Sequence, residues 1–365
     1  NGGKVVDIGR AAFITVLNVI SNTFFSIDLA HYSSDLSGQD FQELVCVIME
    51  IAGKPDIADY FPVLRLVDPQ GAQRRMTICY AKLIEIFDRI INERGPNARN
   101  DLLDSFLNLA EDDNSELSHN DFKHLLLVLT NFLIALLLSR TPNSLLELTL
   151  SKANDKSITL SLLVYRKLNQ GLTQHRTVEW AMAELLHNPE KIAKARDELE
   201  KVLGKDGLVQ ELDISKFPFL QAIVKETFRL HPPAPFLVPH KVETFVEMCG
   251  FTVPKNAQII VNVWAMGRDP SIWTDPNIFL PERFLERTTD FKGQDFELIP
   301  FGAGRRICPG LPLANKMVHL MLASLVHCFH WRLADELKPE DIDMSETFGI
   351  TLHRSEPFRA IPIRV

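Results

Sequence analysis

The amino-acid sequence predicts a mainly α-helical fold that carries a small β-sheet. Up to about residue 231, apolar residues recur at three- and four-residue intervals, the spacing of amphipathic helices. From Phe245 to Ala265 the pattern changes to the alternation of apolar and polar residues that is typical of strands. At 365 residues and 46% hydrophobic, the chain is long enough to bury a large core.

Four amphipathic segments are predicted to be helical, and the last is broken in two. They cover residues 7–28, 41–53, 72–94 and 177–204. Asn188 and Pro189 divide the last segment, because proline disfavours helical backbone in the residue before it. The most apolar run, residues 125–138, is shorter than the roughly 18 residues that a membrane span needs, and we expect it to be a buried helix.

The β-rich stretch is predicted to form a hairpin. Gly250 and the turn at Pro254, Lys255 and Asn256 interrupt its alternating pattern, and such residues allow a chain to reverse. Neither an internal repeat nor a low-complexity linker occurs in the sequence. The small sheet is therefore expected after the main run of helices.

Charge and cysteine content argue against several classes of protein. A net charge of −8 and a pI near 5.8 do not suit a nucleic-acid partner, which needs a clustered positive surface. Five scattered cysteines without a CxxC pair indicate neither a disulfide framework nor a zinc site, so a reducing, cytosol-facing environment is expected. The first residues contain neither an initiator Met nor a signal segment, and the chain is expected to be a fragment.

The stretch FGAGRRICPG, residues 301–310, holds one cysteine in a glycine-rich, positively charged loop. A long amphipathic run follows, so Cys308 is expected at a helix N-cap and Pro309 at the first helical position. Backbone N–H groups would then lower the pKa of the thiol and stabilise a nucleophilic or metal-binding thiolate. A buried structural cysteine at a glycine-rich turn is the alternative.

Other residues of this loop suit a flat or bulky ligand. Arg306 is positioned to meet an acidic group. Glycines leave room for the backbone to pass close to the ligand, and the loop has three of them: Gly302, Gly304 and Gly310.

The pattern F-x-x-G-x-R-x-C-x-G, from Phe301 to Gly310, resembles the cysteine loop of the cytochrome P450 family. The resemblance implies a partial cytochrome P450 fold with haem b as its cofactor, in which Cys308 is the axial ligand of the iron and Arg306 holds a haem propionate. His240 stands where family members often direct a basic residue at a propionate, and a surface histidine is the alternative reading. The remaining cofactor-binding positions are Phe301, Gly302, Gly304 and Gly310.

Two further motifs carry the resemblance. In KETFRLHPP, Glu226 and Arg229 lie three residues apart on one expected helix, so their side chains leave the same face and can pair. A surface pair is the alternative, but the surrounding apolar residues favour a partly buried one. FLPERF supplies Arg283, and in the family these three residues form a structural triad beneath the haem loop.

The sequence after Thr177 and, less distinctively, residues 5–129 are similar to plant cytochrome P450s of the geraniol 8-hydroxylase type. This implies a monooxygenase on the cytosolic face of the endoplasmic reticulum membrane that takes electrons from NADPH through NADPH–cytochrome P450 reductase. Its expected substrate is a small monoterpenoid alcohol such as geraniol, and another small apolar or phenolic metabolite is the alternative. By position in the family, the apolar pocket is expected to be lined by Phe236, Leu237, Phe348 and Ile350.

The sequence also departs from the family. We expect it to lack the family's N-terminal anchor helix and first sheet strands, and the oxygen-activating A-G-x-D-T-T pattern does not occur. Some forty extra residues stand before Thr177, and LTQHR just before it can be encoded by bases that give Thr-Asp-Thr-Thr-Ser in another frame. We therefore expect one cytochrome P450 domain over residues 1–365, without its N-terminal part, and an aberrant insert at 130–176, where a lineage-specific loop is the alternative.

Three function classes follow from these observations. The first is a haem-thiolate monooxygenase. The second is a related enzyme that rearranges peroxides or dehydrates without oxygen. The third is a truncated or mis-spliced product that is catalytically silent.

Overall fold

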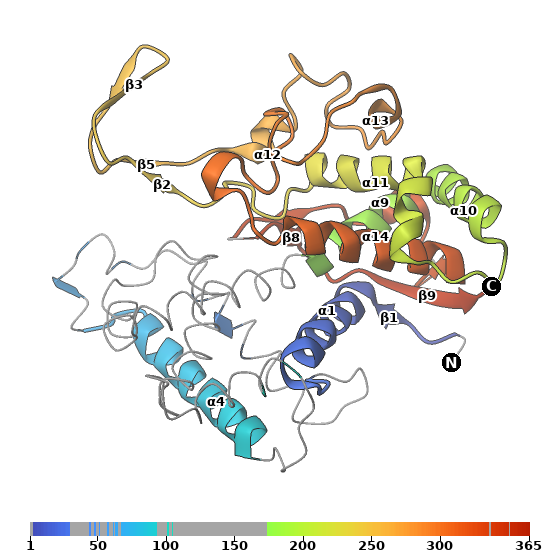
Figure 1. Ribbon diagram of the computed structural model, residues 1–365, viewed down its shortest axis with the longest axis horizontal. Coiled ribbons are helices and arrows are strands. Elements are labelled where there is room, and N and C mark those ends of the chain that lie inside the picture. The colour runs from blue at the N-terminus through green and yellow to red at the C-terminus, as the bar shows by residue number, and fades with distance from the viewer. Residues whose placement is uncertain are drawn as a thin grey trace. The chain divides into compact units, whose positions relative to one another are not determined.

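The computed structural model describes residues 3–29, 67–92, 174–335, 337–349 and 351–365, together with positions 44, 47, 48, 51, 57, 61, 63, 64, 101 and 104. The chain divides into two compact units. The C-terminal unit comprises residues 1–13 and 170–365, and the N-terminal unit comprises residues 14–169. Figure 1 shows the elements in chain order, and each unit is described by itself.

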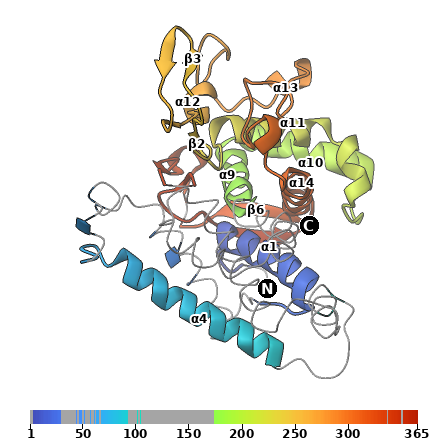
Figure 2. The same ribbon diagram turned by 60° about the vertical axis from the view of Figure 1, so that its left-hand side comes forward.

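The C-terminal unit is built on four helices. They are α9 (Gln174–His187), α10 (Pro189–Leu203), α11 (Pro218–Leu230) and α14 (Leu311–Cys328). Helix α14 packs against the other three, and its apolar face joins theirs in one buried core. In Figures 1 and 2, α11 lies on one side of α14 and the sheet that contains β6 lies on the other. The predicted break at Asn188 and Pro189 is confirmed.

The first turn of helix α11, which carries Glu226 and Arg229, is stabilised by a residue of another helix. Pro218 occupies one of its first positions, where a missing N–H is tolerated. The carboxylate of Glu198 on α10 accepts hydrogen bonds from the backbone N–H groups of Phe219, at 2.8 Å, and Leu220, at 2.9 Å. These bonds satisfy two of the unpaired donors of the first turn and fix α11 against α10.

The strands of the C-terminal unit form four small antiparallel sheets rather than the single one predicted. The largest joins β1 (Val6–Asp7), β9 (Arg359–Arg364) and β6 (Phe329–Leu333), with Trp331 opposite Pro362. The predicted hairpin is confirmed around Gly250: β3 (Val246–Met248) pairs with β4 (Phe251–Val253). Figures 1 and 2 show it projecting from the helices. The other pairs are β2 (His240–Lys241) with β5 (Gln258–Ile259) and β7 (Glu346–Thr347) with β8 (His353–Arg354).

Short helical turns connect these elements. They are α12 (Val263–Met266), α13 (Arg283–Glu286) and three 3₁₀ turns, η2 (Glu211–Lys216), η3 (Gly304–Arg306) and η4 (Pro339–Asp341). Because α13 packs against α11, the third arginine of the expected triad comes close to the other two members.

Helix α1 (Ile8–Phe25) begins in the C-terminal unit and continues into the N-terminal one. Helix α4 (Ala72–Asn92) lies in the N-terminal unit, where the carboxylate of Asp68 accepts bonds from the N–H groups of Gln73 and Arg74 and caps its first turn. Both confirm predicted helices. The expected helix at 125–138 and most of the expected insert at 130–176 lie outside the described residues. None of the described helices combines the length and apolar character of a membrane-crossing segment.

Candidate functional site

The loop of Cys308 is a tight turn held by its own backbone. The N–H of Cys308 donates to the carbonyl of Phe301 at 2.9 Å, and the N–H of Ile307 donates to that of Gly304 at 3.2 Å. Gly302 and Gly304 have φ of 72° and 67°, a left-handed conformation that favours glycine. A Cβ placed on either glycine would meet nothing within 4 Å. At these two glycines, the backbone of the loop therefore borders open space.

Three sequence predictions about this loop are wrong. Helix α14 begins at Leu311 with Gly310 as its N-cap, so Cys308 is not the N-cap and Pro309 is not in the helix. Burial raises the pKa of the Cys308 thiol above its ordinary value, although hydrogen bonds from the N–H groups of Gly310 and Leu311 act in the opposite direction. Desolvation outweighs the two donors, and the thiol is protonated at neutral pH.

The loop nevertheless fits a haem thiolate ligand. The two N–H groups point at the sulfur, and they would stabilise the negative charge that a metal induces on it. The open backbone at Gly302 and Gly304 leaves space for a flat group. Arg306, in η3, and His240, in β2, are both exposed, and among the described residues neither side chain makes a hydrogen bond or ion pair.

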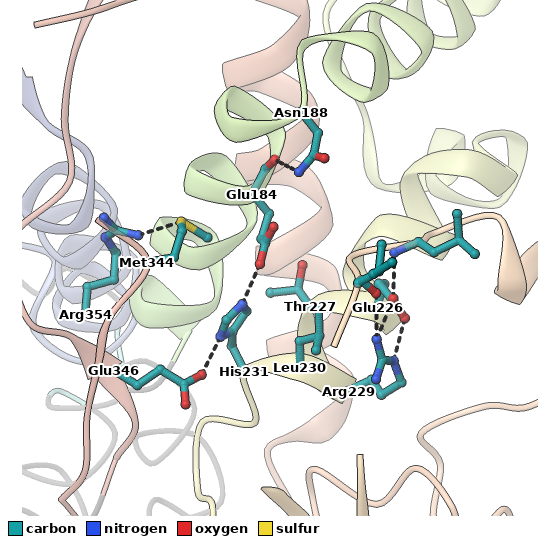
Figure 3. Close-up of polar contacts among 12 residues, drawn as sticks. Glu184, Asn188, Glu226, Thr227, Arg229, Leu230, His231, Met344, Glu346 and Arg354 are labelled. Carbon is teal, nitrogen blue, oxygen red and sulfur yellow. Dashed lines mark hydrogen bonds and ion pairs between the residues drawn. The ribbon is translucent and has the colours of Figure 1, made fainter. Parts of the chain in front are cut away.

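Glu226, Arg229 and Arg283 form a buried ion cluster. The side chains of Glu226 and Arg229 are 0% exposed and pair through two bonds, Arg229 Nε to Oε2 at 2.8 Å and Nη2 to Oε1 at 2.7 Å (Figure 3). Arg283 Nε also donates to Glu226 Oε1, at 3.1 Å. This burial is deeper than the sequence predicts.

The remaining donors of the cluster bind backbone carbonyls of the segment 267–278. Arg229 Nη1 donates to Gly267 and, at 2.7 Å, to Pro276. Arg283 Nη1 donates to Thr274 at 2.8 Å. Each charge therefore has several partners, which offsets the desolvation of burying it. The arrangement holds an irregular loop against α11.

An aromatic cluster joins this helix to the loop of Cys308. The ring of Phe228 on α11 lies 5.1 Å from that of Phe301 and 5.2 Å from that of Phe291, and the rings of Phe291 and Phe301 are 5.8 Å apart. Phe301 is also the acceptor for the N–H of Cys308. Packing of these three rings thus connects helix α11, which carries the ion cluster, to the loop of Cys308.

Two of the expected pocket residues lie together at an exposed edge. Phe236 and Phe348 are 41% and 49% exposed, and their ring centroids are 6.5 Å apart. Leu237 is next to Phe236, with a φ of 48°. Trp264 extends the edge, its ring lying 5.6 Å from that of Phe348. Ile350 lies outside the described residues.

Sequence reasoning missed a second buried network. His231 lies between Glu184 on α9 and Glu346 on β7, residues 47 and 115 positions away in the chain. Trp264 and Arg268 also bind Glu346. The only local signal was a histidine after Leu230 at the end of a helix, because its partners are remote in sequence.

A hollow lies beside this network. Its volume is about 680 Å³, and it is lined by Asn262, Trp264, Ala265, Met266, Arg268, Asp269, Pro270 and Asn277. No residue of the Cys308 loop lines it. This hollow and the thiol are therefore separate features.

Several known proteins with similar sequences come from plants. The chain is 48% identical over 369 residues to cytochrome P450 76T24 of Catharanthus roseus, covering 99% of this chain and 66% of that protein. Identity is 46% to drimenol monooxygenase of Persicaria hydropiper and 44% to geraniol 8-hydroxylase of C. roseus, with 66% of each relative covered. The chain thus spans slightly less than two thirds of their length.

A solved structure of a zebra fish cytochrome P450 with progesterone matches the fold, with a TM-score of 0.70, 23% identity, and coverage of 99% of this chain and 72% of that one. The sequence profile described as cytochrome P450 matches residues 1–135 and 172–358, and leaves out residues 136–171, which lie within the expected insert. With the profile covering most of the sequence and relatives near 45% identity along almost its whole length, the chain belongs to the cytochrome P450 family.

Proposed function

We propose that this chain is a haem-thiolate monooxygenase that hydroxylates a small monoterpenoid alcohol such as geraniol. The loop of Cys308 carries the proposal, because a thiol facing two backbone N–H groups stands beside the open backbone of Gly302 and Gly304. A single sulfur ligand in a cradle open to a flat group suits haem.

The residues proposed to hold haem divide into three roles. Cys308 ligates the iron, and because its thiol is protonated at neutral pH, binding displaces that proton. Arg306 and His240, which are exposed, pair with the propionates. Phe301, Gly302, Gly304 and Gly310 shape the cradle, and the cluster of Glu226, Arg229 and Arg283 supports it through Phe228.

When bound, haem would supply the activation of dioxygen: with two electrons from NADPH and two protons, one oxygen atom would enter a C–H bond of the substrate and the other would leave as water. The proposed electron donor is NADPH–cytochrome P450 reductase at the endoplasmic reticulum membrane. The chain's own contribution is to exclude water and orient the substrate with the aromatic edge formed by Phe236 and Phe348.

The substrate class rests on two observations. The relatives include proteins named for geraniol and for drimenol. The expected pocket edge is aromatic and apolar, which suits a small hydrocarbon skeleton. Another small apolar or phenolic metabolite of similar size is the alternative substrate.

Reconstitution tests the proposal. The expressed chain is loaded with haem, reduced and exposed to carbon monoxide, and the adduct is expected to absorb at the long wavelength of thiolate ligation. With NADPH, the reductase and geraniol, hydroxylated geraniol is expected by mass spectrometry. Absence of the thiolate spectrum would overturn haem ligation by Cys308, and a thiolate spectrum with hydroxylation of other substrates only would overturn geraniol.

A catalytically silent chain is the second candidate, and one observation favours it. The stretch LTQHR, residues 172–176, stands where the family's acid and alcohol for proton delivery are expected, and helix α9 begins within it at Gln174. Gln174 is 2% exposed, and its amide atoms have no hydrogen-bond partner among the residues that the structure describes. Sequencing the transcript decides between the candidates: a mature message that encodes residues 130–176 as written, with hydroxylation by the expressed chain, excludes the silent product.

A further inference from the structure

His231 is held on both sides by carboxylates. Its Nε2 lies 2.8 Å from Oε1 of Glu184, and its Nδ1 lies 2.8 Å from Oε1 of Glu346 (Figure 3). His231 and Glu184 are 5% and 6% exposed. Water therefore has little access to the two contacts.

The geometry bears on which ring nitrogens of His231 carry protons. A carboxylate only accepts hydrogen bonds, and a neutral imidazole donates from only one nitrogen. With both carboxylates ionised, both contacts are hydrogen bonds only when both ring nitrogens carry protons. Burial alone raises the pKa of Glu346, but hydrogen bonding and charge from His231, with help from Arg268 and Trp264, bring it below its ordinary value.

Other charged groups surround the ring. Arg268 donates to Glu346 Oε1 at 3.0 Å and to the carbonyl of Leu230. The indole of Trp180 on α9 stacks on His231, with ring centroids 3.8 Å apart and planes 3° apart. The guanidinium of Arg354 on β8 lies 5.1 Å from the Trp180 ring, and Glu179 and Glu184 act electrostatically on it. The two carboxylates bound to His231 are its direct partners.

His231 and its partner Glu346 lie near the start of the two segments that carry Phe236 and Phe348. Phe236 follows His231 by five residues, in the segment that leaves α11. Phe348 follows Glu346 by two residues. Trp264 connects Glu346 to the aromatic edge, since its Nε1 donates to Glu346 Oε2 at 2.8 Å and its ring contacts that of Phe348.

We propose that His231, held as an imidazolium between Glu184 and Glu346, is a positioning residue that sets the separation of Phe236 and Phe348 and so the size selectivity of the apolar pocket. The pocket assignment rests on the proposed function, whereas the positioning of the two rings does not. The two segments are also joined by a hydrogen bond from the N–H of Leu352 to the carbonyl of Pro233, at 3.0 Å. This bond keeps them together when the ion pairs are removed.

NMR of the full chain tests the positioning without haem chemistry. With ¹⁵N-labelled histidine, His231 is expected to show protons on both ring nitrogens at neutral pH, and His231→Gln assigns the signals. Fluorophenylalanine at 236 or 348 is expected to give one sharp ¹⁹F resonance in the parent and in His330→Gln, a change at an exposed strand residue. The resonances are expected to shift and broaden in His231→Gln and Glu346→Gln.

Two outcomes overturn the proposal. One is a His231 ring with a single protonated nitrogen. The other is unchanged ¹⁹F resonances in a folded His231→Gln or Glu346→Gln chain, with folding checked by cooperative unfolding. Should His231→Gln not fold, Glu346→Gln decides, because its amide oxygen still accepts a bond while the charge is lost.

Ligand binding then tests selectivity. In the haem-loaded chain, apolar alcohols of increasing size are titrated by the change in the haem spectrum. Glu346→Gln is expected to change the ratio of dissociation constants for large and small ligands by about tenfold, with the carbon monoxide adduct intact. An unchanged ratio overturns the selectivity role. If the parent binds no haem, the proposed function fails while the NMR still decides the positioning.

Discussion

The ion cluster of Glu226 and the loop of Cys308 are joined by three phenylalanine rings, yet their polar groups are satisfied in opposite ways. In the cluster, two arginines and a glutamate are buried and bind one another and the carbonyls of a loop. In the loop, Arg306 is exposed and two glycines face open space. The groups of the cluster have protein partners, whereas Arg306, Gly302 and Gly304, which we propose to face haem, are exposed or border open space.

Breaking the cluster is expected to have the largest effect on stability. Arg229→Ala leaves Glu226 buried with part of its partners missing, and losing one member of a buried pair destabilises a protein by about 3 to 5 kcal/mol. Glu226→Ala is expected to do the same. Chemical denaturation measures this, with Arg306→Ala as the matched control, expected within about 0.5 kcal/mol of the parent because its side chain is exposed. Equal stability of Arg229→Ala and the parent would show that the cluster is not needed for the fold.

A pair of glycine variants sharpens the same comparison. A Cβ on Gly267 would lie 2.2 Å from the backbone oxygen of Arg229, so Gly267→Ala is expected to force the cluster apart and cost about 3 kcal/mol. Gly304→Ala meets no atom and only strains a left-handed backbone, at about 1 kcal/mol. Thermal unfolding of both variants gives the order, and the reverse order would contradict this account of the two regions.

Changing the thiol is expected to separate function from stability. Cys308→Ala removes one partly buried sulfur, so the free energy of unfolding is expected to fall by about 1 kcal/mol. The long-wavelength carbon monoxide band is nevertheless expected to disappear, because Cys308 is the proposed source of the thiolate. The absorption spectrum of the reduced, haem-loaded variant is the measurement, and a band identical to that of the parent would exclude Cys308 as the ligand.

The smallest expected effect is on thiol reactivity before haem is bound. Because burial raises the pKa of Cys308, its thiolate fraction is low at neutral pH, and alkylation is expected to be slower there than at the exposed Cys249. The raised pKa of Cys308 also affects stability. Its contribution to the free energy of unfolding is fully present at pH values below the pKa of an unfolded thiol, about 8.5, and is lost as the pH rises through the pKa of the folded chain. Mass spectrometry of the alkylated chain across pH measures the rates. Alkylation of Cys308 as fast as that of Cys249 at neutral pH would contradict the prediction.

Much of the local structure follows from local pattern. The periodicity of residues 72–94 predicts α4, Pro189 predicts the break between α9 and α10, and Gly250 predicts the β3–β4 hairpin. Such signals depend on a few neighbouring residues, and they survive without knowledge of the packing. Strands β6 and β9 were missed, because β9 contains Pro362 and its partners lie at residues 6–7 and 329–333.

By itself the sequence determined the family pattern around Cys308, the pairing of Glu226 with Arg229, and the helical character of the fold, since all three depend on residues a few positions apart. Tertiary structure alone decided the complete burial of that pair, the raised pKa of Cys308 and the binding of His231 by two carboxylates. Desolvation depends on everything packed around a group, and the two carboxylates on His231 come from positions 47 residues before it and 115 after it. No local pattern encodes such a meeting, because the partners approach only when α9, α11 and β7 pack together.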